Sequence, residues 1–187
     1  AYYARQLWLY VLGMIGHRAS GDRNVPGTQS QDDVNFYTWG EQESGRGANQ
    51  VTSALQHFVD RRLSGDPGIK KVILYSDSCT GQNKNYAMVG MLNVLATRHD
   101  IEIEHVFPVR GHSYMPADRA FGRVEKKLRR IETIVLPEEY LSAFSDVGRV
   151  LVHGSDWHAS NVKEAVDACI KRPPPFKITE AKRIKVF

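Results

Sequence analysis

The stretch that most constrains the fold lies at residues 71–85, where an apolar run changes abruptly into a polar segment that contains glycine. Residues 72–75 read Val-Ile-Leu-Tyr, a short run of strand-forming residues with polar neighbours on both sides. Such a strand is typical of the middle of a sheet that is covered on both faces. Residues 80–83 then predict a turn, and residues 83–98 carry the apolar spacing of a helix. We therefore expect a central strand, a turn and a helix.

Asp77 follows this predicted strand almost at once. Ligands of open α/β sheets bind beyond the carboxyl ends of the strands, which makes Asp77 a candidate functional carboxylate. In a second interpretation, Asp77 only stabilises the turn by accepting hydrogen bonds from its own backbone. The sequence leaves both interpretations open.

The remaining pattern predicts an α/β core at residues 1–135 and a small α+β appendage at residues 136–187. Further core strands are expected at residues 5–16, 34–39 and 100–109, and further helices at residues 48–63 and 116–130. The first two strands are expected to pair antiparallel, in one mixed sheet with helices on its faces. In the appendage we expect a helix at 137–144, a strand at 149–153, a helix at 160–171 capped by Ser160, and a basic β-like end.

Asp118 lies near the start of the predicted helix 116–130, and its spacing from Phe121 places it on the apolar side of that helix. Glu125 lies two turns further along on the same side. If Asp77 and Asp118 converge at one end of the sheet, they form the kind of oxygen-rich site that divalent cations prefer. Two-metal phosphoryl-transfer sites are built from such carboxylates.

Composition limits the compartment and the partners. Two cysteines in 187 residues favour a reducing compartment, either nucleus or cytoplasm. No apolar run reaches the roughly 20 residues that span a bilayer, so no membrane partner is expected. The dinucleotide fingerprint is absent, and no small-molecule cofactor is expected. The net charge of +4 permits a nucleic-acid partner, and a homo-oligomer is also compatible with the sequence.

Several cations are candidates for contact with a phosphate backbone: Arg46, Lys84, Arg110, Lys126, Lys127 and Arg130. Lys84 lies at a helix N-terminus, where a phosphate binds readily, although ordinary helix capping explains its neighbours equally well. The cluster at residues 123–130 is also compatible with a solvated helix face.

Two strings carry a family resemblance: SDSCTGQNKN at residues 76–85 and RGHSYMPADRAFGRVEKK at residues 110–127. With RQLWLY at 5–10, WGE at 39–41 and RG at 46–47, they resemble a transposase-like domain widespread in insect and other invertebrate genomes. The order of elements also resembles the ribonuclease H-like fold with its first strand missing. The resemblance covers about residues 2–140.

The resemblance implies Mg²⁺- or Mn²⁺-dependent cleavage or joining of DNA. It assigns Asp77 and Asp118 to two of three metal-binding carboxylates and places the first on a strand before residue 1. Glu41 and Glu125 are supplementary metal ligands under this reading, and His112 assists proton transfer. The residues themselves allow a second interpretation of each role. Glu41 could lie in a solvated loop and pair with Arg46, and His112 could be a structural histidine. A catalytically silent module that binds nucleic acid or protein is the alternative function.

Overall fold

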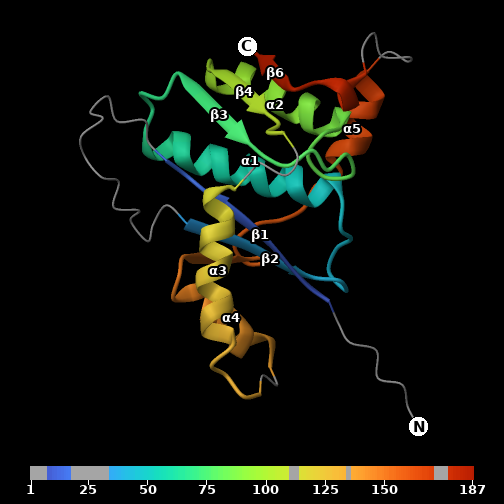
Figure 1. The fold of residues 1–187 in the computed structure, drawn as a ribbon. Helices are drawn as coiled ribbons and strands as arrows, with labels where there is room; N and C mark the ends of the chain where they lie inside the picture. Colours follow the sequence, from blue (N-terminus) through green and yellow to red (C-terminus); the bar gives the residue numbers. More distant parts are fainter. Residues whose placement is uncertain (1–7, 18–33, 110–113, 134–135, 171–176) are drawn as a thin grey trace, which may run out of the picture. The chain divides into compact units, whose positions relative to one another are not determined.

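Five α-helices and six strands make up the described part of the chain, and the strands form two separate three-stranded sheets (Figure 1). The structure is a computed structural model that describes residues 8–17, 34–109, 114–133, 136–170 and 177–187. The chain divides into two compact units. Unit 1 comprises Ala1–Glu43 and Tyr114–Asp156, and unit 2 comprises Ser44–Ser113 and Trp157–Phe187.

Unit 1 contains a sheet of order β1-β2-β5 and two helices. The strands are β1 (Leu9–Ile15), β2 (Val34–Gly40) and β5 (Arg149–Val152), and the helices are α3 (Pro116–Leu128) and α4 (Pro137–Ser145). Strands β1 and β2 pair antiparallel, which confirms the pairing predicted from the sequence. Strand β5 adds to β2 in parallel, with Phe36 opposite Val150.

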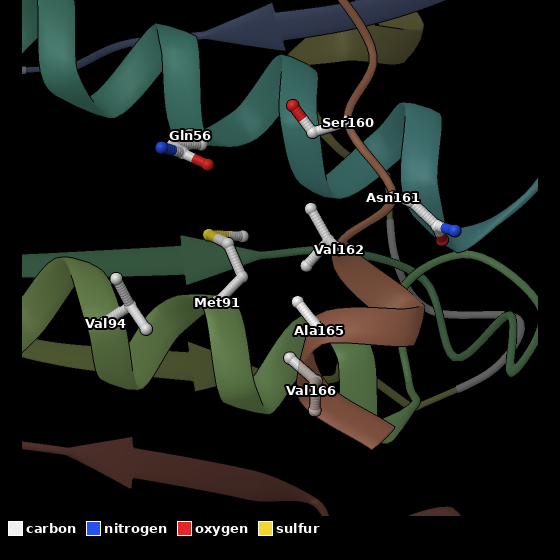
Figure 2. Close-up of a pocket in the computed structure, with 8 residues that line it drawn as sticks. All are labelled: Gln56, Met91, Val94, Ser160, Asn161, Val162, Ala165 and Val166. Carbon is white, nitrogen blue, oxygen red and sulfur yellow. The ribbon is translucent and has the colours of Figure 1, made fainter. Parts of the chain in front are cut away.

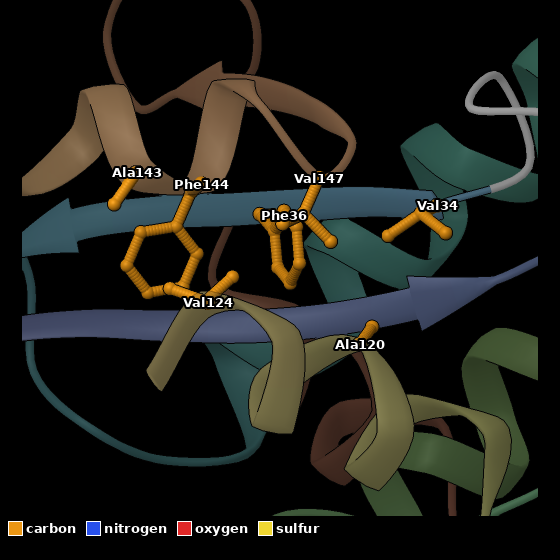
Figure 3. Packing of buried hydrophobic residues seen from close by; sticks show 7 residues of the cluster. All are labelled: Val34, Phe36, Ala120, Val124, Ala143, Phe144 and Val147. Atoms are coloured by element: carbon orange, nitrogen blue, oxygen red, sulfur yellow. The ribbon is translucent and has the colours of Figure 1, made fainter. Parts of the chain in front are cut away.

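The core of unit 1 lies between this sheet and the two helices (Figure 3). Phe36 of β2 is fully buried, and its ring meets those of Phe121 and Phe144 edge to face at centroid distances of 5.5 and 5.0 Å. Gly13 of β1 permits this packing, because a Cβ at that position would lie 2.7 Å from the Phe121 ring. A glycine in a strand interior often marks such a close approach.

Unit 2 contains a sheet of order β3-β4-β6 with three α-helices. In chain order its elements are α1 (Ala48–Gly65), β3 (Lys71–Tyr75), α2 (Tyr86–His99), β4 (Glu102–Val106), α5 (Val162–Cys169), the 3₁₀ turn η2 (Ile178–Glu180) and β6 (Arg183–Val186). Strands β3 and β4 are parallel, and β6 is antiparallel to β4. Helix α2 contacts β4 and β6, and it also packs against α1 and α5.

The three helices of unit 2 leave an apolar cavity of about 210 Å³ between them. Figure 2 shows Met91 and Val94 of α2 opposite Val162 and Val166 of α5, with Gln56 of α1 above them. Figure 2 thus shows apolar side chains of α2 and α5 facing each other across the cavity.

The expectation that residues 71–76 form a central, doubly covered strand is wrong. Strand β3 lies at the edge of its sheet, and β4 occupies the centre. Ile73 and Tyr75 are 47% and 62% exposed, whereas Val72 and Leu74 are half-buried. On the same face as the two exposed side chains, Lys71 pairs with Glu102 and Glu104, so this face of the strand carries ion pairs and is not covered by apolar side chains.

The two strands expected within residues 136–187 are present as β5 and β6, but the sheets that they join differ from expectation. This segment was expected to be an appendage beside one mixed sheet, but it contributes β5 to one sheet and β6 to the other. The expected boundary near residue 135 does not coincide with a boundary between the two units. Helix α5 is capped by Asn161, whose Oδ1 accepts a hydrogen bond from the Glu164 amide, rather than by Ser160. None of the helices in the described ranges combines the length and apolarity needed to cross a bilayer.

The packing of unit 1 predicts that Phe36→Ala lowers the free energy of unfolding by about 3–5 kcal/mol, because it leaves a cavity between three aromatic rings. Urea denaturation followed by circular dichroism measures the change. Trp8→Ala is the control, since Trp8 belongs to the same unit and is 62% exposed. Equal losses in the two variants would contradict the packing described here.

Candidate functional site

The loop between β3 and α2 is stabilised by Asp77. Its Oδ1 accepts hydrogen bonds from the Cys79 amide at 3.1 Å and from the Asn83 side-chain amide at 2.6 Å. The first contact is an Asx turn, in which a side chain replaces a backbone carbonyl. The turn-stabilising interpretation of Asp77 therefore describes its contacts in unit 2. Its side chain is exposed, and its Oδ2 receives no hydrogen bond from the described residues.

The Cys79 carbonyl also stabilises this loop. It accepts hydrogen bonds from three successive amides, those of Gln82, Asn83 and Lys84, at 3.3, 2.8 and 3.0 Å. The chain then enters α2, where Asn85 Oδ1 accepts the Met88 amide at 2.9 Å. Residues 76–85 are thus a hydrogen-bonded turn that leads directly into a capped helix.

Lys84 is buried at the end of this turn, with only 8% of its surface exposed. Its ammonium lies 5.0 Å from the centroid of the Phe107 ring, in a cation–π contact. Among the described residues, no carboxylate lies within ion-pair distance of Lys84. Lys84 was predicted from the sequence as a phosphate contact, which stays a prediction, and the structure shows it as a buried cation beside an aromatic ring.

His105 of β4 lies beside the start of the same loop, and the sequence analysis did not select it. Its Nε2 is 2.8 Å from Ser76 Oγ, and Ser76 Oγ donates its proton to the Asp77 carbonyl at 3.1 Å. This arrangement fits the tautomer with its proton on Nε2. Burial lowers the pKa of His105 from 6.5 to about 4, so the ring is neutral at pH 7. Inward-facing and outward-facing residues alternate over residues 101–109, and the inward position of His105 in this pattern could have identified it.

The other predicted carboxylates are all exposed or half-buried. Asp118 Oδ2 accepts the Met115 amide at 2.7 Å and so stabilises the start of α3. Glu125 pairs with Arg129 at 2.6 Å on the outside of the same helix. Glu41 is held through its backbone amide, which donates to the Trp8 carbonyl at 3.0 Å. Asp118 and Glu125 thus have local contacts at α3, whereas the backbone of Glu41 is bonded to the segment just before β1.

Asp77 belongs to unit 2 and Asp118 to unit 1, and their expected convergence stays a prediction. Within the described ranges, no group of three or more His, Cys, Asp or Glu side chains is placed to hold a metal ion. Asp77 and Asp118 each supply one carboxylate, which does not by itself fit a two-metal site. His112 and Arg110 lie outside the described residues.

Most of the predicted cations are on the surface. Arg46, Lys126 and Arg130 are exposed, whereas Lys127 binds Asp146 at 2.6 Å. Arg119 and Arg123 are also exposed, and Arg119 was missed by the sequence analysis. Together these residues form a basic stripe, which we define as Arg119, Arg123, Lys126 and Arg130. Its residues are spaced by four, three and four positions, which is the pattern of neighbours on one face of a helix and could have identified the stripe from the sequence.

The sequence and fold together define a mixed α/β protein whose most distinctive string, residues 76–85, forms a turn at a strand end. Residues 4–173 match the family described as Domain of unknown function (DUF7869), and the chain belongs to that family. No curated protein and no solved structure is significantly similar to the chain.

The environment of His105 predicts a pH-dependent stability. A histidine that titrates near 6.5 when unfolded and near 4 when folded binds its proton more tightly in the unfolded state. Stability is therefore complete above about pH 6.5 and falls as the pH drops towards 4, by about 3 kcal/mol in total. Urea denaturation at a series of pH values measures the loss.

His105→Gln should remove most of the pH dependence between 6.5 and 4, because glutamine has no proton to bind. His158→Gln is the control, since His158 belongs to the same unit and is exposed. A wild-type ring that titrates near 6.5 in an NMR experiment on the folded protein would contradict the burial of His105.

Proposed function

We propose that this protein binds nucleic acid through the phosphate backbone, and that the basic stripe on α3 is the main contact surface. The observation that carries the proposal is the alignment of its four cations. At 3.6 residues per turn, Arg119, Arg123 and Lys126 fall on one side of α3. Phe121 and Leu128, which pack against the core of unit 1, mark the opposite side. Arg130 continues the stripe in the turn that follows the helix.

The charges of the stripe are available to a polyanion. None of its four residues forms an ion pair with another described residue, in contrast to Lys127 and Arg129 nearby. From the rise per residue, the stripe is about 16 Å long. Double-stranded DNA carries one charge per roughly 1.7 Å of axis, so several phosphates lie within that length.

The resemblance to a transposase-like domain supports DNA as the nucleic acid. In this proposal the chain derives from a ribonuclease H-like transposase, in agreement with its order of two strands followed by alternating helices and strands. The antiparallel β1-β2 pair and the parallel β3-β4 pair are compatible with such an origin. The stripe lies within the string RGHSYMPADRAFGRVEKK and just beyond it, so this proposal gives part of that string a role.

A salt titration tests the proposal. Binding to a labelled 20-base-pair duplex, measured by fluorescence anisotropy, should weaken with a slope of about −3.6 in log affinity against log salt, since each neutralised phosphate contributes about −0.9. The triple variant Arg119→Gln/Arg123→Gln/Lys126→Gln should have a slope near −0.9. Sequence should have little effect, because backbone contacts carry no sequence information directly.

Arg129→Gln is the matched control, because Arg129 lies beside the stripe but pairs with Glu125. Its slope should stay close to that of the wild type. Circular dichroism checks that glutamine, a good helix former, keeps α3 intact. Absence of binding at 50 mM salt, or an unchanged slope in the triple variant, would contradict the proposal.

Metal-dependent cleavage or joining of DNA is the second candidate. The observation that favours it is Asp77, an exposed carboxylate just past the carboxyl end of β3, with one oxygen uncommitted within the described residues. This function requires Asp77 and Asp118 in one site, together with a further carboxylate. In the resemblance, that carboxylate comes from a strand before residue 1.

Cleavage of labelled DNA in Mg²⁺ and in Mn²⁺ tests this candidate. Three proteins are compared: residues 1–187, a version extended upstream, and the extended version with Asp77→Asn. We expect activity only in the extended wild type, because residues 1–187 supply too few carboxylates to gather two dications. Activity of residues 1–187 that survives Asp77→Asn would mean that another residue carries the reaction.

A further inference from the structure

We propose that a cavity at the start of α2 binds the phosphate group of a phosphate ester, with Lys84 as the principal cationic contact. The cavity has a volume of about 310 Å³ and lies wholly in unit 2. Its lining comes from the β3–α2 turn, the first turn of α2 and the η2 segment: Thr80, Lys84, Asn85, Tyr86, Lys177, Ile178 and Thr179. The site is distinct from the basic stripe, which belongs to unit 1.

Lys84 supplies the strongest argument. Its side chain is more than nine-tenths buried, and among the described residues it makes no ion pair and no side-chain hydrogen bond. Most of the Lys84 side chain is enclosed, and its ammonium contacts the Phe107 ring but has no counter-charge among the described residues. An anion in the cavity that Lys84 lines would supply the missing counter-charge.

The helix start and a second lysine at the cavity also favour an anion. Helix α2 has 14 residues, and its positive dipole end lies at the cavity through Asn85 and Tyr86. Lys177 adds a second cation, and among the described residues it pairs only with Glu180, at 3.6 Å in a highly exposed pair.

Thr80 and Thr179 are among the lining residues, and each has a hydroxyl that can donate a hydrogen bond to a phosphate oxygen. Donors from two separate segments suit a tetrahedral phosphate, which offers oxygens in several directions.

The size and the remaining lining indicate an ester rather than inorganic phosphate alone. Ile178 is buried against the site, and the Tyr86 ring borders it. Apolar lining with a few placed polar groups is typical of sites that bind a ligand with an apolar part. The chemistry fits a nucleoside 5′-phosphate, either free or at the end of a single strand, with the sugar or base against Tyr86 and Ile178.

Phosphate binding would also explain why the turn at residues 76–85 holds Lys84 in a fixed position. The Cys79 carbonyl binds the Lys84 amide directly, and Asp77 fixes Asn83 beside it. Residues 76–85 therefore hold one lysine at one helix start. Preorganised cations of this kind bind anions without the cost of ordering a flexible side chain.

Titration of ¹⁵N-labelled protein tests the site. The probes are inorganic phosphate, adenosine 5′-monophosphate and a 5′-phosphorylated single-stranded hexanucleotide. We expect the phosphate esters to shift the amide signals of residues 80–86 and 177–179, with inorganic phosphate at least several-fold weaker. Saturation by the monophosphate identifies a free nucleotide as sufficient, whereas saturation by the hexanucleotide alone identifies a strand end. Failure of both esters, or shifts confined to other residues, would overturn the proposal.

Lys84→Met keeps an unbranched side chain that is one atom shorter and removes the charge, and it should weaken binding of the better ester at least tenfold. Lys70→Met is the matched control, because Lys70 lies before β3, at the opposite end of that strand, and pairs with exposed Asp100. Lys177→Met, at an exposed position, gives a second variant that should weaken binding several-fold without disturbing the fold. Equal affinity in all three variants and the wild type would overturn the role of Lys84.

These outcomes are separable from those for the basic stripe. Duplex binding that depends on Arg119, Arg123 and Lys126 tests unit 1, whereas ester binding that depends on Lys84 tests unit 2. Either result stands if the other fails.

Discussion

The parallel ladder between β3 and β4 is the interaction on which the candidate site of unit 2 depends. It places Lys71 opposite Glu102 and Tyr75 opposite Val106, so both strands end at the same edge. The Ser76 amide then continues the ladder by donating to the Val106 carbonyl at 3.3 Å, and the Ser76 hydroxyl meets His105. Because the chain leaves the sheet at this point, the following turn begins from a fixed position. The position of Lys84 therefore depends on the register of two strands.

Charges on the outer face stabilise this register. Glu104 is only 5% exposed, and it lies within ion-pair distance of Lys71, Arg183 and Lys185 from the two neighbouring strands. Hydrogen bonding to Lys71 lowers the pKa of Glu102, and the same contacts raise the pKa of Lys71. The cations of these pairs are exposed to water although Glu104 is not, which limits the energy that each pair contributes. A slip of β4 by one residue would move Glu102 and Glu104 to the helix-covered face, away from the cations of β3 and β6, so these charges act mainly by excluding other registers.

The sequence predicted the elements well and their neighbours less well. Periodicity located α1, α2 and α3 to within a few residues, and the antiparallel β1-β2 pair followed from adjacency in the chain. The pairing of Asn35 with Arg149 joins distant segments, and no local pattern encodes it. The exposure of Ile73 and Tyr75 was hidden for a similar reason, since an apolar run does not reveal which face a helix covers. Asp77 was found by its place after a strand, but the enclosure of Lys84 depends on tertiary structure.

The carbonyl and the thiol of Cys79 differ in their contacts. The carbonyl binds three amides within the turn, whereas the residue itself is exposed and its thiol is free. The chain has one other cysteine, Cys169, which is also exposed. A Cys169→Ser protein thus carries a single reactive thiol, five residues from Lys84 and attached to a backbone fixed by three hydrogen bonds. A fluorophore or spin label attached to Cys79 would lie near the cavity on a hydrogen-bonded backbone. This turn is therefore a suitable labelling position for spectroscopy.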